Sequence, residues 1–69
     1  MQKWEYTLGV YEEKTLQKSK ITSGSRSFES TRKMLSYLGE QGWELTSVST
    51  FSITGTTKFE YFYFKRPKE

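Results

Sequence analysis

The stretch LGEQGWEL, Leu38 to Leu45, decides how the chain is built, because it joins the one predicted helix to a strand. Gly42 is expected to adopt the left-handed conformation that closes a helix in a Schellman cap. Trp43 would then pack back on Leu38, the third-last helical residue. A site in which Gln41 and the neighbouring glutamates do chemistry is the alternative, but only the cap explains the positions of both Gly42 and Trp43.

Upstream of this junction, residues 27–41 have the pattern of an amphipathic helix. Ser27 is the expected N-cap, since its hydroxyl can accept from the free amides of the first turn. Glu29 and Lys33 are expected to form an i,i+4 ion pair. The apolar stripe at helical spacing consists of Phe28, Thr31, Met34, Leu35 and Leu38. Gly39 weakens a helix and has no explanation in the pattern.

Downstream of the junction, residues 43–53 and 58–65 are rich in β-branched and aromatic residues and predict two strands. Residues 54–56, Thr-Gly-Thr, supply the turn of this hairpin. Pro67 is expected to stop the pairing of the second strand, because proline cannot donate to a ladder.

The N-terminal part predicts one further strand and an uncertain segment. Residues 3–10 alternate, with Trp4, Tyr6, Leu8 and Val10 on one side, which is typical of a half-buried strand. Residues 11–25 are polar and predict either a loop or a weak strand paired with the first. The expected fold is therefore a single α+β domain over residues 1–69. It has one helix on a three- to four-stranded antiparallel sheet, in the order β-(β)-α-β-β.

Composition excludes most chemistry. The 69 residues contain no Cys, His or Asp, so disulfides, thiolate metal sites and the usual catalytic bases are excluded. A pair of glutamates, Glu5 and Glu44, is the remaining route to acid–base catalysis if the two meet across neighbouring strands. We therefore predict no enzyme, no metal and no cofactor. A chain of this length buries only about 60% of its unfolded surface, so oligomerisation, as a dimer or a larger assembly, is the expected source of extra stability.

Positive charge is concentrated in the middle of the chain. The net charge is +3, and residues 14–33 hold six basic residues against Glu29 alone. Such a segment either keeps a small protein soluble or faces an anionic partner. Within it, SGSRS, Ser23 to Ser27, is a candidate anion cradle if it leads directly into the helix, although capping alone also explains its serines.

The stretch FEYFYF, Phe59 to Phe64, is the strongest pointer to function. Alternation puts Phe59, Tyr61 and Tyr63 on one face and Phe62 and Phe64 on the other. One helix can cover only one of these faces. The other must meet another protomer, a ligand or the segment 11–25, because apolar patches of this kind usually mark interaction sites.

These features predict a non-enzymatic, homo-oligomeric binding protein of the cytoplasm, without a membrane span or a signal peptide. Its partner would be an anionic nucleotide signal or a host protein, which the chain would sequester as an inhibitor. A single-stranded nucleic-acid or DNA-binding module is the alternative. The residues expected to bind the ligand are Arg26, Arg32, Lys58, Phe62, Phe64, Lys65 and Arg66.

Three blocks of the sequence resemble a family of small bacterial and bacteriophage proteins that is classed as a domain of unknown function. The blocks are KWEY at 3–6, LGEQGWELTSV at 38–48 and FKRP at 64–67; Thr46 stands where the family usually has Val. The resemblance implies a common fold but no site residues. The frequency of the family in phage genomes implies a role in the interplay of phage and host.

Overall fold

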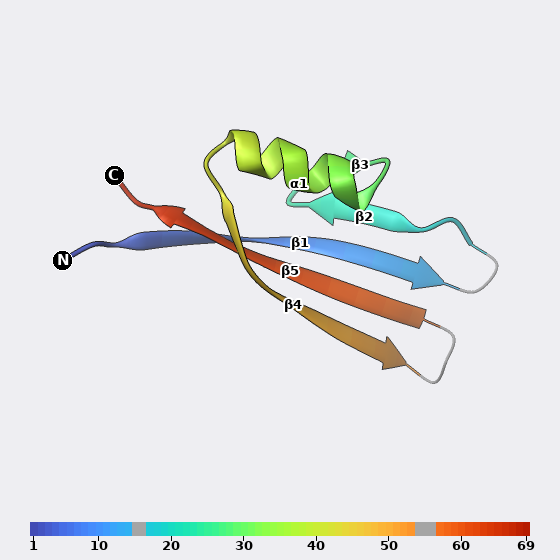
Figure 1. Ribbon diagram of the computed structural model, residues 1–69. Helices are drawn as coiled ribbons and strands as arrows, with labels where there is room; N and C mark the ends of the chain where they lie inside the picture. The colour runs from blue at the N-terminus through green and yellow to red at the C-terminus, as the bar shows by residue number, and fades with distance from the viewer. Residues whose placement is uncertain (15–16, 54–56) are drawn as a thin grey trace.

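The computed structural model describes residues 1–14, 17–53 and 57–69, and these form one antiparallel sheet with one helix on it (Figure 1). The elements are β1 (Trp4–Lys14), β2 (Lys20–Ser23), β3 (Arg26–Phe28), α1 (Thr31–Glu40), β4 (Glu44–Ile53) and β5 (Thr57–Pro67). The five described strands lie in the order β3-β2-β1-β5-β4. The chain is elongated, with extents of 46 × 22 × 17 Å.

The expected three- to four-stranded α+β fold with the order β-(β)-α-β-β is wrong, because the protein is mostly β and three strands precede the helix. β1 continues past Val10 to Lys14, and residues 20–28 form a hairpin whose turn contains Gly24 at φ +62°. The hairpin has little apolar pattern because only Ile21 and Phe28, which pair with each other, face the core. Its remaining positions are polar, and backbone pairing holds them in the sheet.

The helix begins later than expected. Ser27 lies in β3, and Ser30 is the N-cap: its Oγ accepts from the Lys33 N–H at 3.1 Å. The expected ion pair between Glu29 and Lys33 is present, with Lys33 Nζ 2.6 Å from Glu29 Oε1. The hydrogen bond from Lys33, together with its charge, lowers the pKa of Glu29. The pair therefore contributes at neutral pH and is lost as the pH falls through the lowered pKa, an effect that solvent screening keeps small.

The end of the helix confirms the predicted Schellman cap. Gly42 has φ +87°, its N–H donates to Gly39 O, and the Trp43 N–H donates to Leu38 O, each at 3.0 Å. These are the two hydrogen bonds that define the motif. Trp43 packs against the buried cluster that contains Leu38. LGEQGWEL is therefore a helix stop followed by a strand start.

Gly42→Ala should lower the free energy of unfolding by about 1 kcal/mol or more, because an alanine at positive φ is strained. Steric crowding does not contribute, since the nearest atom to an added Cβ is Arg66 Cδ at 4.0 Å. Urea denaturation of the variant measures the loss. An unchanged midpoint would contradict the role of the cap.

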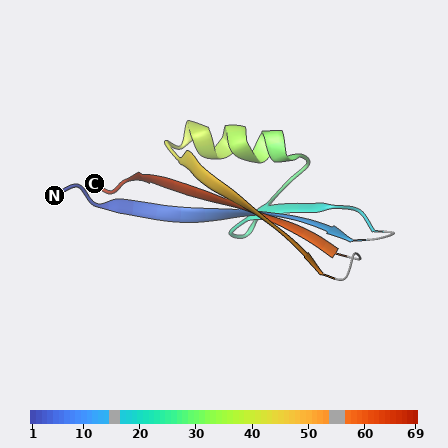
Figure 2. The same cartoon turned by 60° about the horizontal axis from the view of Figure 1, so that its bottom comes forward.

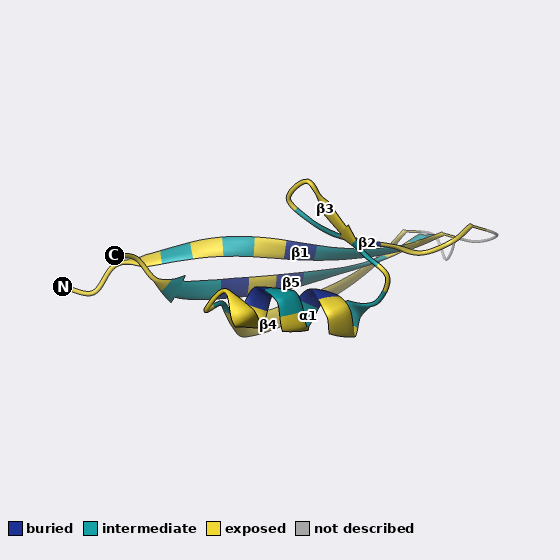
Figure 3. Cartoon of the chain, turned by 90° about the horizontal axis from the view of Figure 1, so that it is seen from above, coloured by how far each residue is buried: buried dark blue, intermediate teal, exposed yellow. Residues whose placement is uncertain are grey.

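The core lies between α1 and one face of the sheet (Figures 2 and 3). Its buried side chains are Ile21, Met34, Leu38, Phe62 and Phe64. Met34 is fully buried and lies over Gly9 of β1, where a Cβ would come within 2.5 Å of its sulfur. Gly9 therefore allows the helix to approach the sheet closely.

Pro67 does not stop the pairing of β5. It lies opposite Trp4 of β1, and the next residue continues the ladder, since the Lys68 N–H donates to Lys3 O at 2.8 Å. Donors alternate along a strand, so the missing N–H of Pro67 would point to the β4 side. β4 begins at Glu44, opposite Lys65, so at Pro67 there is no β4 residue to receive a hydrogen bond. The predicted turn at 54–56 lies outside the described residues.

Candidate binding surface

The face of the sheet that points away from α1, here called the outer face, carries a continuous band of apolar and aromatic residues. Successive residues of a strand point to opposite faces, so the buried residues Gly9, Phe62 and Phe64 identify the inner face. The pairing register then assigns the residues of the outer band: Trp4, Tyr6, Leu8, Val10, Phe51, Ile53, Phe59, Tyr61 and Tyr63. No described element covers this face (Figure 2). The apolar row of β1 is thus its uncovered side.

The exposure of the outer band is large for a chain of this size. Tyr6 is 72% exposed and Phe51 is 52% exposed. Six of the twelve aromatic residues of the chain lie in this band. Contiguous exposed patches of this kind mark interaction sites in proteins of known function.

The rings of the outer band are ordered against one another. Phe59 and Tyr61 stack with ring centroids 6.0 Å apart and planes 7° apart, and Phe51 lies 6.3 Å from Phe59. At the other end of the band, Lys65 Nζ lies 4.2 Å from the centroid of the Trp4 ring. The surface therefore combines flat apolar rings with a cation that already rests on one of them.

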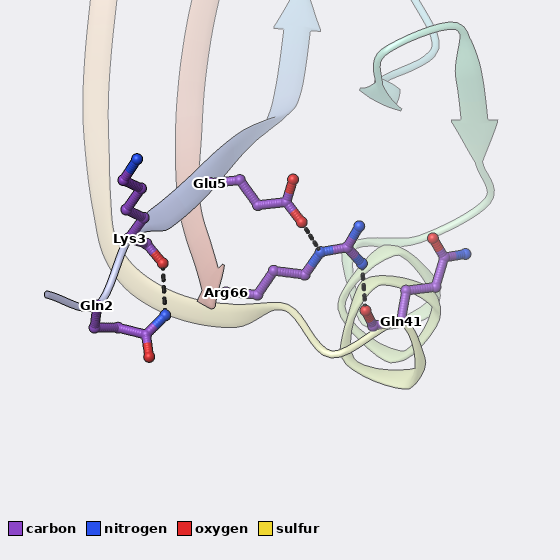
Figure 4. Close-up of polar contacts among 5 residues, drawn as sticks. All are labelled: Gln2, Lys3, Glu5, Gln41 and Arg66. Carbon is purple, nitrogen blue, oxygen red and sulfur yellow. Dashed lines mark hydrogen bonds and ion pairs between the residues drawn. The ribbon is translucent and has the colours of Figure 1, made fainter. Parts of the chain in front are cut away.

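A second cluster lies where the two chain termini meet the end of α1 (Figure 4). Arg66 Nε donates to Glu5 Oε2 at 2.6 Å, and Arg66 Nη1 donates to the Gln41 carbonyl. The guanidinium carbon also lies 4.1 Å from the centroid of the Trp43 ring. An open hollow of about 530 Å³ adjoins this cluster between Gly42 and the C-terminal residues. Because its contacts join β1, β5 and the helix end, Arg66 here holds the fold together.

Arg66→Ala should lower the free energy of unfolding by about 1–2 kcal/mol, because it removes two charge-assisted hydrogen bonds at a site that solvent partly screens. Lys65→Ala is the matched control, since Lys65 lies on the opposite face and should change stability by less than about 0.5 kcal/mol. Thermal unfolding of both variants measures the difference. Equal losses would show that Arg66 does not join these elements.

The structure does not bring the predicted ligand-binding residues together. Phe62 and Phe64 are buried beneath α1, at 7% and 2% exposure, so neither ring offers a surface to a ligand. Of the predicted cations, only Lys65 lies on the outer face. The other four lie on the helix side. Arg26 lies over the Tyr37 ring, Arg32 is in the first turn of α1, Lys58 lies opposite Glu13, and Arg66 pairs with Glu5.

Two other predicted constellations do not form. SGSRS does not lead into the helix, because Gly24 lies in the turn between β2 and β3 and Ser27 lies in β3. Glu5 and Glu44 do not meet, because β5 lies between their strands and they point to opposite faces. Among the described residues, no three acidic, Cys or His side chains gather in a way that could hold a metal ion.

The predicted ligand-binding residues include none of the outer-face rings, which are Trp4, Tyr6, Phe51, Phe59, Tyr61 and Tyr63. Gly9 was the available signal. A glycine among the larger residues of β1 marks the side that an element approaches closely, and the helix therefore had to lie on the side opposite Trp4 and Tyr6.

No family model, curated protein or solved structure that was compared with the chain matches it. The resemblance to the phage and bacterial family therefore stays a prediction. In the part of the chain that the structure describes, no helix has the length and apolar character that a membrane crossing requires.

Proposed function

We propose that the chain is a non-enzymatic, homo-oligomeric binding protein of the cytoplasm that holds an anionic ligand of the nucleotide kind on the outer face. One observation carries this proposal: six aromatic residues lie on the face of the sheet that α1 leaves uncovered. A single helix can bury only one face, and no described element covers the rings of the other face (Figure 2).

The chemistry of the outer face supports a base with an attached phosphate. A planar base stacks on an aromatic ring with a free energy of about 1–3 kcal/mol, and the parallel rings of Phe59 and Tyr61 offer such planes. The ammonium group of Lys65, over Trp4, supplies positive charge at one end of the band. Near the other end, Lys14 and Lys20 lie on the same face around Glu12, which pairs with Lys14 at 3.2 Å, so one positive charge of this group is left over.

The proposed role is sequestration. The chain has no Cys, His or Asp, and Glu5 is held by Arg66 on the opposite side of the sheet. A flat face also lacks the depth that normally keeps a reacting group away from water. Binding without turnover is the activity that such a surface supports.

A single-stranded nucleic acid is the second candidate ligand, because the outer-face rings of β5 follow one another along the strand. Phe59, Tyr61 and Tyr63 recur at every second residue, which gives successive bases a row of stacking positions. This candidate predicts affinity for oligothymidylate that falls steeply with salt, as phosphate contacts require. An affinity that is independent of salt would reject it.

The two tryptophans allow a direct test, because Trp4 lies on the outer face and Trp43 lies at the helix end. Trp43→Phe leaves Trp4 as the reporter, and Trp4→Phe leaves Trp43. ADP should quench the fluorescence of the first variant and leave the second unchanged. Pyrophosphate, which has no base to stack, should quench neither.

Tyr61→Ala in the Trp43→Phe background should weaken the affinity for ADP, measured by titrating the quenching of Trp4, about tenfold. This is the loss expected for one stacking partner. Arg32→Ala, on the helix side, is the matched control and should have no effect. Failure of nucleotides and of oligothymidylate to quench Trp4 would overturn the proposal. Quenching of Trp43 alone would place the ligand elsewhere and overturn it as well.

A further inference from the structure

β4 is an edge strand whose regular part, Ser47–Ile53, lacks the usual protection against pairing. It is the last strand in the sheet order, and all ten of its residues are exposed. Its sequence, ELTSVSTFSI, has one charge, Glu44, and no Lys or Pro. The other edge strand, β3, has only three residues and carries Arg26. Proteins normally blunt long edges with charges, prolines, bulges or short strands. β4 has a charge and a bulge only at its start, so the seven uncharged residues Ser47–Ile53 suggest a partner strand.

β4 also exposes apolar side chains on both of its faces. Leu45 and Val48, on the inner face, are 42% and 47% exposed, because α1 does not reach over them. On the outer face, Phe51 is 52% exposed and Ile53 is 46% exposed. A partner lying on either face would leave the other pair in water. Only a strand beside β4 contacts both faces at once.

We propose that β4 pairs in antiparallel register with β4 of a second copy, with Thr50 on the two-fold axis. The bulge between Leu45 and Ser47 leaves Ser47–Ile53 as the regular part of the strand, and Thr50 is its centre. Even-numbered residues of this part face inward and odd-numbered residues face outward, so a register centred on Thr50 keeps each face continuous.

The side chains of β4 are self-complementary in this register. Val48 lies opposite Ser52 of the partner copy, Phe51 opposite Ser49, and Ile53 opposite Ser47, so each large apolar residue meets a small one. Thr50 lies opposite its own copy, and Thr–Thr pairs are favourable across antiparallel strands. The two Glu44 carboxylates lie at opposite ends of the pair. The joining strands therefore do not repel each other, although each copy has a net charge of +3.

This arrangement rests on the proposed function, because it describes how the proposed homo-oligomer assembles. A two-fold axis perpendicular to the sheet keeps the outer faces of both copies on the same side. The two outer bands then form one aromatic surface, and Phe51 of each copy lies near the centre. The second copy thereby completes the binding surface and leaves the rings accessible.

Engineered cysteines test the register, because the chain has no Cys of its own. In Thr50→Cys the two Cα atoms would lie about 4.5–5.5 Å apart across the axis, within disulfide range. Ser52→Cys is the matched control on the same face, since its two copies would lie about 14 Å apart at 3.4 Å per residue. Mild oxidation should convert the first variant into a covalent dimer at least about tenfold faster than the second.

Light scattering on the wild-type protein completes the test and should show a dimer. If the wild-type protein is an oligomer but the two cysteine variants cross-link equally, or neither does, edge pairing is overturned while the proposed function stands. If the wild-type protein is a monomer that still binds ADP, edge pairing and the homo-oligomer fail together, but the outer-face site does not. Circular dichroism of the reduced variants checks that both are folded.

Discussion

Phe64→Ala is expected to unfold most of the protein at room temperature, whereas Tyr63→Ala, one residue away, should leave it folded. Phe64 is 2% exposed and lies in the core beneath α1, while Tyr63 is 42% exposed on the outer face. Truncating a buried Phe costs about 3–5 kcal/mol. A core of this size rarely supplies more than about 3–5 kcal/mol in total, so the first loss is close to the whole stability.

Urea denaturation followed by circular dichroism measures both variants. The expected result is a large loss of native signal without urea for Phe64→Ala and a nearly unchanged midpoint for Tyr63→Ala. The reverse order would mean that α1 covers the other face of FEYFYF. In that case the aromatic band assigned to the outer face would be the core.

Gly9→Val should lower the free energy of unfolding by about 1–3 kcal/mol or more, as overpacking of a core does. A Cβ at Gly9 would lie 2.5 Å from the Met34 sulfur, 2.9 Å from its methyl carbon and 3.4 Å from a Phe64 ring carbon. The Met34 side chain is flexible but fully buried, so it can yield only by repacking within the core. Either Met34 must repack or α1 must move away from the sheet, and both disturb the core.

Gly39→Ala is the matched control, because a Cβ at Gly39 meets nothing within 4 Å. This substitution in α1 should raise the free energy of unfolding by up to about 1 kcal/mol, since alanine favours the helix. Thermal unfolding of both variants separates the two glycines. A tolerated valine at position 9 would contradict the close approach of α1 to β1.

The helix end within LGEQGWEL was predictable, because local chemistry determines it. A glycine followed by a tryptophan after an apolar helical stripe specifies the Schellman cap, and the cap formed. The hairpin at 20–28 was not predictable in the same way. Its strands have only Ile21 and Phe28 facing the core, and contacts with β1 and α1 stabilise it. Patterns carry no signal for a strand whose pairing comes from tertiary structure.

The existence of an uncovered aromatic face could be predicted from the sequence, but two of the residues chosen for it, Phe62 and Phe64, lie on the covered face. The two-sided aromatic pattern of β5 correctly required one uncovered face. It could not identify that face, because Phe62 and Tyr63 have similar apolar character. The side that α1 covers depends on Gly9, a residue of another strand, and on the burial of Met34. The predicted cations were scattered because sequence proximity to an aromatic strand does not specify a face.

The three blocks that carry the family resemblance meet in the structure. Glu5 of KWEY binds Arg66 of FKRP, and Arg66 stacks on Trp43 of GWEL. On the other face, Lys65 lies over Trp4. These contacts account for the blocks as a structural clasp between the two ends of the chain and the helix end. They do not involve the other rings of the outer band, which is the surface proposed for binding.

The most direct test of the outer face as the binding surface is an aromatic carbon–proton NMR spectrum of the wild-type protein titrated with ADP. We expect saturable shifts in the ring signals of Trp4, Tyr61 and Tyr63. The rings of Phe62, Phe64 and Tyr37, on the helix side, should change little. Shifts confined to the helix side, near Tyr37 and Trp43, would contradict binding at the outer face.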